Sequence, residues 1–264
     1  MYGIAVLDEL LYLSGSLIMR RAYQAVRDRG GLASPKLVAK RALRLSGKAP
    51  DFSPAICEAI FGRDPAFHRL NGHWYIKPLI DCKGPISECE FTVLDFEATG
   101  GKPPDDRITE VAMVRFKNGK VIDEFSTLVN PGRQIPHYVV KLIGITDKMV
   151  SGCPSIEDII GGMLEFMRGS LLVVHNASGD LPFLDYECIR LFGGIVGLPV
   201  FDTQHMARRF IPDIGGLGLE RIASHFGVEL TDRHRAMGDV RTTCRILECF
   251  LEAVGTRLPY EVFL

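Results

Sequence analysis

The apolar positions near the start of this 264-residue chain recur with the period of a helix. They run from Leu7 to Val26 and stop at Gly30-Gly31, where a helix is expected to end. Ser34-Pro35 and Ser53-Pro54 predict two further helix starts, because serine can cap free N–H groups while proline occupies the first helical position. The first part of the chain is therefore expected to be mainly helical.

Residues 66–76 change to the pattern of a strand pair. Asn71-Gly72 lies between the segments 66–70 and 73–76 and favours a tight type I′ turn, which needs positive φ angles. Helices followed by such a hairpin resemble a winged-helix module, and the sequences Asp-Pro-x-Phe and Asn-Gly-x-Trp resemble its wing. This winged-helix-like helical domain is expected to cover residues 1–80, and residues 81–89 are expected to be a linker.

Two roles are open for the N-terminal domain. In one, a helix with Lys36, Lys40, Arg41 and Arg44 faces DNA; in the other, the domain docks a protein or a second copy, and these residues are a solvated face. Residues 1–80 hold 12 Lys and Arg against 6 Asp and Glu, and the remainder hold 19 against 26. This asymmetry suits a protein that binds phosphates with one part and metal ions with the other, and chance variation of surface charge is the alternative.

The second part, residues 90–264, shows strands first and then strands that alternate with helices. The expected strands are 91–97, 108–116, 121–129, 171–174 and 199–201, and the expected helices are 155–167, 181–191, 217–226 and 237–254. Lys117-Asn118-Gly119-Lys120 predicts a hairpin turn between the second and third strands. We therefore predict an α/β fold, a mixed sheet flanked by helices and preceded by the small, mostly helical domain.

The composition is that of a globular protein, with 47% hydrophobic residues and a net charge of −1. The apolar run from Leu10 to Met19 is too short to span a bilayer, and no secretory signal is recognisable, so we expect no membrane contact. The seven cysteines, an odd number without a Cys-x-x-Cys pair, predict neither a disulfide framework nor a zinc site. A reducing cytoplasm is the expected compartment.

Two acids end the first strand of the second part. Asp95 and Glu97 are one residue apart and project from the same face, because side chains alternate along a strand. Neighbouring carboxylates repel each other unless a hard divalent cation lies between them, and Mg²⁺ and Mn²⁺ prefer carboxylate oxygen. The pair indicates a metal site, and a solvated strand end is the alternative.

Further acids occur in two later segments. Asp180 follows the strand 171–174, and ligands of open α/β sheets usually bind beyond the carboxyl ends of strands. Asp239 lies in or near the first turn of the last long helix, where the helix dipole favours a carboxylate. His234 precedes Asp239 by five residues, about 500° around a helix, so both can face one site only if His234 lies on the preceding loop.

Three motifs in this order resemble those of a known family: Asp-x-Glu-x-Thr-Gly at 95–100, His-Asn-x-x-x-Asp at 175–180 and His-x-Ala-x-x-Asp at 234–239. They are similar to the exonuclease motifs of the DnaQ-like DEDDh family, which includes the proofreading epsilon subunit of bacterial DNA polymerase III. The resemblance covers roughly residues 90–254. It implies an RNase H-like sheet, two divalent cations (Mg²⁺ or Mn²⁺), and removal of 5′-monophosphates from nucleic-acid 3′ ends.

Individual roles follow from the same resemblance. Asp95, Glu97, Asp180 and Asp239 match the four metal-binding carboxylates, and His234 matches the general base. The residues expected beside the substrate are Ala98, Thr99, Gly144, Ile145 and Asn176. Asp202 is expected to cap a helix rather than to bind metal.

The chain also departs from the epsilon subunit. Ala98 stands where many members have a second threonine, and the chain ends about ten residues after the last helix, without the long tail by which epsilon subunits hold the polymerase. A free-standing exonuclease and a polymerase-associated proofreader are therefore both open, and the oligomeric state is not predicted. The leading expectation is an exonuclease acting on 3′ ends of single-stranded DNA. The alternatives are an exoribonuclease and a nucleic-acid-binding scaffold with an inactive nuclease fold.

Overall fold

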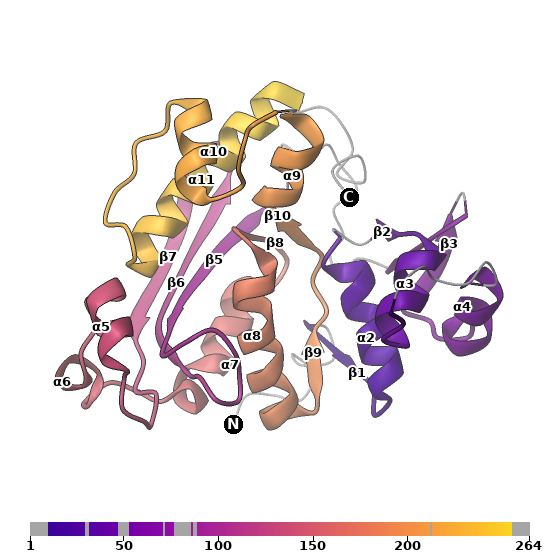
Figure 1. The fold of residues 1–264 in the computed structure, drawn as a ribbon, viewed down its shortest axis with the longest axis horizontal. Helices are drawn as coiled ribbons and strands as arrows, with labels where there is room; N and C mark the ends of the chain where they lie inside the picture. Colours follow the sequence, from indigo (N-terminus) through magenta and orange to yellow (C-terminus); the bar gives the residue numbers. More distant parts are fainter. Residues whose placement is uncertain are drawn as a thin grey trace.

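A computed structural model describes residues 10–29, 32–46, 53–70, 72–76, 86, 89–211 and 213–254. These residues form a five-stranded sheet flanked by helices and, beside it, a smaller unit of helices and short strands (Figure 1). The predicted α/β class with a mixed, helix-covered sheet is confirmed.

The central sheet has the strand order β10-β8-β5-β6-β7. Its strands are β5 (Phe91–Ala98), β6 (Ile108–Lys117), β7 (Lys120–Leu128), β8 (Leu171–Val174) and β10 (Val200–Asp202). The pairs β5–β6 and β6–β7 are antiparallel, whereas the pairs β5–β8 and β8–β10 are parallel. Asn118 and Gly119, both with positive φ, form the predicted turn between β6 and β7.

Helices cover both faces of this sheet (Figure 1). α7 (Ile156–Met167) and α8 (Ala177–Phe192) cover one face, and α9 (Thr203–Phe210), α10 (Leu219–Phe226) and α11 (Ala236–Val254) cover the other. α5 (His137–Ile143) and α6 (Asp147–Val150) form a small separate core against the end of β7. Phe91 and Val93 of β5 pack into a core with α9, α10 and α11, whereas Leu94 and Phe96 pack into a second core with α7 and α8. Because side chains alternate along a strand, Asp95 and Glu97 leave β5 on the face that α11 covers.

The smaller unit comes from the N-terminal part of the chain. It contains α2 (Leu17–Arg27), α3 (Pro35–Ala42), α4 (Ser53–Phe61) and an antiparallel sheet of β2 (Leu32–Ala33), β4 (His73–Ile76) and β3 (Phe67–Leu70), in that order. Ser34 caps α3, Pro35 lies in its first turn, and α4 begins at Ser53, as predicted. The predicted hairpin is the pair β3 and β4. The likeness to a winged helix stays a prediction.

Residues 11–13 correct one prediction, because they form a strand and not part of a helix. This strand, β1 (Leu11–Leu13), pairs antiparallel with β9 (Gly194–Val196), which follows α8. The helix α2 begins only after Ser16, whose side chain accepts a hydrogen bond from the N–H of Met19. The N-terminal unit is thus joined to the larger one by a two-stranded sheet.

Buried polar contacts hold the two units together as well. The side chain of Arg27, which is 1% exposed, donates to both carboxylate oxygens of Asp185 at 2.7 and 2.8 Å and to the carbonyl of Val196 at 2.9 Å. The hydroxyl of Tyr23 donates to the carbonyl of Gly197 at 2.8 Å. A buried, fully bonded charge pair fixes the angle between α2 and α8, since any displacement leaves a charge without a partner.

The expected linker 81–89 lies outside the described residues except for Ile86 and Cys89, so the domain boundaries stay a prediction. Cys89 is disulfide-bonded, which the cysteine pattern did not predict, and the other described cysteines are free thiols. Within the described ranges, no helix has both the length and the apolar composition that a membrane span needs.

Candidate active site

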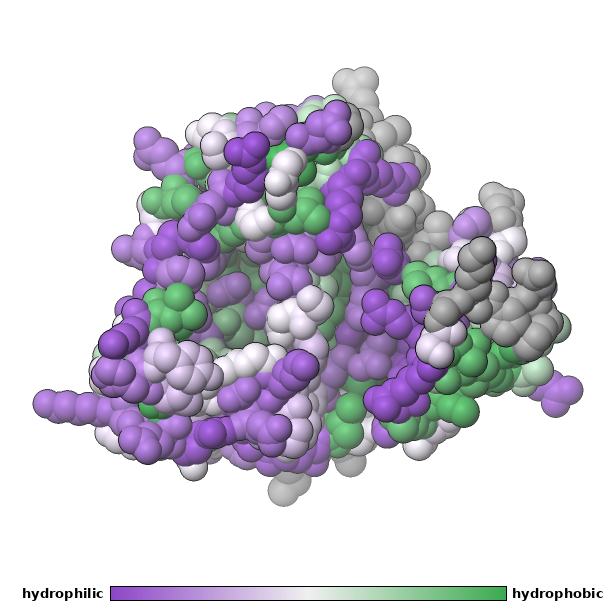
Figure 2. Space-filling view, viewed as in Figure 1, coloured by the Kyte–Doolittle hydropathy of each residue, from purple (hydrophilic) through white to green (hydrophobic). Residues whose placement is uncertain are grey.

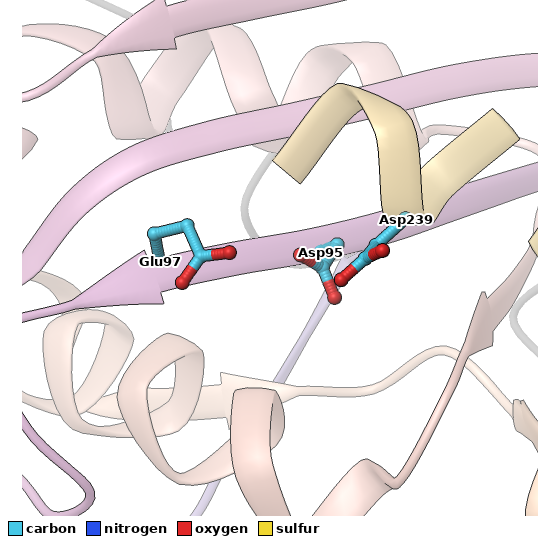
Figure 3. Close-up of side chains that lie close together, drawn as sticks. All are labelled: Asp95, Glu97 and Asp239. Carbon is cyan, nitrogen blue, oxygen red and sulfur yellow. The ribbon is translucent and has the colours of Figure 1, made fainter. Parts of the chain in front are cut away.

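Three of the predicted acids lie together where β5 meets the start of α11. One carboxylate oxygen from each of Asp95, Glu97 and Asp239 can be chosen so that the three atoms lie within 4.8 Å of one another. Figure 3 shows the carboxylates of Asp95 and Asp239 facing each other, with Glu97 further along the same strand. The alternation of side chains along β5 gives the first two acids a common face, and the packing of α11 against that face supplies the third.

Asp180 approaches from the other side of β5, in the first turn of α8. It is 8% exposed, and its Oδ1 accepts a hydrogen bond from the backbone N–H of Phe96 at 3.2 Å. It lies outside the group of three, yet its charge is close enough to raise the pKa of Asp95. The four acids therefore meet at the junction of β5, α8 and α11.

Burial and mutual repulsion raise the pKa of these carboxyl groups and so favour their protonated form. Burial is the main cause that raises the pKa of Glu97 to about 7, with repulsion from Asp239 and Glu110 added. Burial likewise raises the pKa of Asp180 to about 8, and burial followed by the charges of Asp180 and Glu97 raises that of Asp95. Such a cluster of oxygen donors fits a hard divalent cation, because the cation removes the repulsion between the ionised groups.

His234 lies on the loop before α11, where sequence reasoning required it to be. It has a φ of 60° and is partly exposed, two residues before the helix begins. Burial raises the pKa of Asp239, and Arg233 and then His234 act in the opposite direction, so the histidine lies close to this carboxylate. The loop thus keeps the histidine beside one of the acids without placing both on a single helix.

A close contact between backbones fixes this loop against α11. A Cβ atom added to Gly238 would lie 2.2 Å from the carbonyl oxygen of Thr231 and 2.4 Å from that of Asp232. Those distances are shorter than any non-bonded contact allows. Only glycine lets the first turn of α11 approach the loop so closely, and Asp239 is the next residue.

Glu110 of β6 is a site residue that sequence reasoning missed. It pairs in register with Glu97, is 3% exposed, and accepts hydrogen bonds from the Arg235 guanidinium at 2.7 Å and from the N–H of Ala236 at 3.0 Å. The carboxylate therefore caps the first turn of α11 and anchors the residue after His234. A charged residue inside the apolar strand 108–116 was the available signal.

Arg233 is the second residue that was missed. Its guanidinium donates to both oxygens of Asp239, at 3.3 and 3.2 Å, and to Glu220 at 2.9 Å. These bonds partly neutralise Asp239 and help to lower its pKa, although burial acts more strongly and leaves that pKa raised. The side chain of Arg233 thus binds one of the candidate metal ligands.

The residues expected beside the substrate have different surroundings. Ala98 ends β5, partly exposed, next to Glu97. The side chain of Thr99 is fully buried, and its oxygen accepts from the N–H of Arg107 at 3.0 Å. Gly144 is exposed and ends α5 with a φ of 73°, whereas Ile145 is buried in a small core beneath α5 and α6.

Asn176 begins α8 in the left-handed conformation, with a φ of 67°. Asp202 accepts from the N–H groups of Asn176, Ala177 and Gln204, so it caps α9 as predicted and also holds the first turn of α8. His175 bonds Thr203 at 2.8 Å, and burial lowers its pKa to about 4, which keeps the ring neutral. These contacts position Asp180.

Acids gathered around the central strand of a mixed sheet, with a histidine on the adjacent loop, form a set of donors that suits metal-dependent cleavage of a phosphodiester. The chain belongs to the exonuclease family RNase_T, whose model matches residues 92–247. This match places it among the DnaQ-like exonucleases that the three motifs indicated.

Relatives and solved structures agree with this family. The chain is 37% identical over 159 residues to the PolC-type DNA polymerase III of Clostridium perfringens and 38% identical over 165 residues to that of Caldanaerobacter subterraneus. These matches cover 60% and 62% of this chain but only 11% and 12% of the polymerases. The chain thus resembles one segment of much longer proteins.

The fold is shared with two solved exonucleases. A structure of exonuclease X in complex with 5′ overhanging duplex DNA has a TM-score of 0.52 at 24% identity, covering 66% of this chain and 99% of that one. The nuclease domain of 3′hExo, a DEDDh family member bound to rAMP, has a TM-score of 0.55 at 21% identity, covering 65% and 95%. Both confirm the RNase H-like fold expected from the motifs.

Proposed function

We propose that this protein is a metal-dependent 3′–5′ exonuclease that removes 5′-monophosphates from the 3′ ends of single-stranded DNA. The observation that carries the proposal is the convergence of Asp95, Glu97 and Asp239 within 4.8 Å, with Asp180 next to them and His234 on the adjacent loop. All five residues of the motifs are present, which argues against an inactive scaffold.

Asp95, Glu97, Asp180 and Asp239 are the residues that would hold two divalent cations. Bound there, the cations would lower the pKa of a water molecule and offset negative charge on the phosphate. His234 would accept the proton of the attacking water. The water oxygen bonds to phosphorus, the bond from phosphorus to the 3′ oxygen of the preceding nucleotide breaks, and that oxygen leaves with a proton.

DNA is the favoured substrate because the two curated relatives described above are named as DNA polymerases. The same names make a DNA polymerase the proposed protein partner. RNA is the second candidate, since the 3′hExo structure holds rAMP. Discrimination between the two sugars depends on the surroundings of the 2′ position.

The test uses 5′-labelled single-stranded DNA and RNA of matched sequence, incubated with the protein in Mg²⁺ or Mn²⁺. We expect a ladder of shortened DNA products that requires the cation and disappears with EDTA. A ladder on RNA alone would reassign the substrate.

Asp239→Ala is the matched variant, and it should abolish cleavage while the protein still binds the labelled strand. Asp213→Ala, at another aspartate before α10, should retain full cleavage. Full activity of Asp239→Ala would overturn the assignment of the site. Binding by the unaltered protein without cleavage of either strand would favour a scaffold.

A further inference from the structure

A cleft of about 530 Å³ separates the N-terminal unit from α8. One side of the cleft is lined by three arginines: Arg21 of α2, Arg41 near the end of α3 and Arg44 just beyond it. The other side is lined by residues of α8, among them Ser178, Pro182 and Tyr186. Figure 2 shows hydrophilic side chains gathered where the two units adjoin. The exonuclease motifs use none of the three arginines.

The positive charge in this cleft is not balanced. The two acids that line it, Asp28 and Asp185, are both bound by the buried Arg27. Among the described residues, the side chains of Arg21, Arg41 and Arg44 form no ion pair within 4.0 Å and no hydrogen bond, and Arg41 and Arg44 are exposed. The charge of Arg41 acts on Asp28, but the two do not form an ion pair within 4.0 Å. Exposed guanidinium groups without a bound carboxylate suit a phosphodiester, which they bind through two N–H groups at once.

The cleft reaches the N-terminal end of α8, where Ala177 and Ser178 line it. Asp180 follows in the same turn but is about 200° around the helix from Ser178, so it faces β5 and the other acids and not the cleft. Positive charge also continues past the cleft toward α9, because Arg29, Arg41 and Arg208 all act on His205. A strand whose 3′ end lay at Asp95 and Asp180 would therefore reach the cleft by passing around the N-terminal end of α8, beside α9.

We propose that this cleft binds the phosphate backbone of the single-stranded nucleic acid several nucleotides 5′ of the scissile bond. The inference rests on the proposed exonuclease function and adds a role for the N-terminal unit. Arg41 and Arg44 bind phosphates without reading the bases, and the buried pair of Arg27 and Asp185 holds their wall in place. The cleft extends substrate contact beyond the nucleotides at the catalytic acids.

The test compares Arg41→Gln/Arg44→Gln with the control Lys36→Gln/Lys40→Gln. The control removes the same charge from exposed positions of the same helix that do not line the cleft. The measurement is kcat/KM in Mn²⁺ over a range of NaCl concentrations, for a labelled DNA of about 20 nucleotides and for a trinucleotide, which is too short to contact both sites.

The arginine variant should lower kcat/KM for the long strand about tenfold at low salt and reduce the slope of its logarithm against log[salt] by about 1.4, or 0.7 per phosphate contact. Cleavage of the trinucleotide should not change, and the lysine control should behave like the unaltered protein. An unchanged salt slope, an equal loss on the trinucleotide, or an equal loss in the control would overturn the proposal.

If the unaltered protein cleaves neither strand, the proposed exonuclease function has failed, and the cleft is tested by binding instead. Fluorescence anisotropy of the long strand in EDTA then compares the same variants. A weaker affinity confined to the arginine variant supports the cleft, and equal affinities overturn it.

Discussion

Glu110 is a single residue that links the sheet to the loop with His234. Its carboxylate binds Arg235 and the N–H of Ala236, so the loop with His234 and the first turn of α11 are held by one side chain of β6. It also lies opposite Glu97, where its charge helps to raise the pKa of that acid. The same residue thus affects the position of the histidine and the protonation of a candidate metal ligand.

Glu110→Gln should lower kcat by roughly 10- to 100-fold, the range seen when groups that orient metal ligands are replaced. The amide cannot accept from Arg235 and Ala236 together as a carboxylate does, so His234 and Asp239 lose their fixed place. Steady-state kinetics on the labelled strand measures the effect, and KM should change little.

Glu124→Gln is the control for this prediction, because Glu124 of β7 also binds an arginine of α11. That arginine, Arg241, lies two residues after Asp239 and therefore about 200° around the helix from it, so the pair points away from the acids. The kcat of Glu124→Gln should equal that of the unaltered protein. Equal losses in both variants would show that general attachment of α11, and not the loop, is what matters.

Arg233 competes with any cation for Asp239, since it donates to both oxygens of that carboxylate. Arg233→Gln should therefore lower the Mn²⁺ concentration for half-maximal activity roughly threefold. This factor is the change in affinity that corresponds to the free energy of one partly exposed ion pair. Titration of activity with Mn²⁺ measures it. Arg245→Gln, which loses only a surface pair with Glu248, should leave the midpoint unchanged, and a raised midpoint in Arg233→Gln would contradict the idea.

The sequence predicted some of these residues and missed others for one physical reason. Asp95 and Glu97 share a face because of the local period of a strand, and His234 is excluded from α11 by the local period of a helix. Glu110 and Arg233 act through partners 125 and 6 residues away, and no local period reports which residues pair across a fold. Glu110 stands out as the one acid in the apolar strand 108–116, but the sequence does not indicate that its partner is Arg235.

The elements of the larger unit were predictable because most carry their own boundary signals. Ser155 and Asp158 form the capping box of α7, and Asp202 caps α9. The stretch at Leu11–Leu13 has no such signal and adopts a strand because β9, far along the chain, offers a free edge. A short apolar run suits a helix or a strand, and only the partner decides.

The buried ion pair of Arg27 and Asp185 is expected to stabilise the attachment of the N-terminal unit to α8. Asp185→Ala leaves the guanidinium of Arg27, 1% exposed, without its main partner and should lower the free energy of unfolding by about 3–5 kcal/mol. Urea denaturation followed by circular dichroism measures the loss. Removing both charges with Arg27→Met/Asp185→Leu should cost less than Asp185→Ala alone, because the buried guanidinium and its buried partner are then both absent. Asp28, which also loses its bond to Arg27, is 36% exposed and can be solvated.

An exposed ion pair of the same unit supplies the comparison. Glu58 and Arg69 are 54% and 53% exposed, so Glu58→Ala should cost no more than about 1 kcal/mol. If the two alanine variants lost equal stability, the attachment of α2 to α8 would not depend on the buried pair.

At the scale of the whole molecule, repulsion among the acids makes stability depend on pH and on metal. The folded protein holds the pKa of Glu97 at about 7, from 4.5, and that of Asp180 at about 8, from 3.8. Between about pH 4 and 8 the folded state therefore binds more protons than the unfolded state, so the free energy of unfolding falls as pH rises through this range. The metal-free protein should melt at a lower temperature near pH 8 than near pH 5.

Divalent cations should reverse this loss, because they bind the ionised carboxylates and only in the folded state. Excess Mn²⁺ should raise the melting temperature strongly near pH 8 and little near pH 5, where protons compete for the same oxygens. Asp180→Asn removes one buried charge, so near pH 8 it should raise the melting temperature in EDTA and reduce the gain from Mn²⁺. Differential scanning fluorimetry of both proteins measures these melting temperatures. If Asp180→Asn melted below the unaltered protein in EDTA, Asp180 would stabilise the metal-free fold. Repulsion among the acids would then not be the dominant effect.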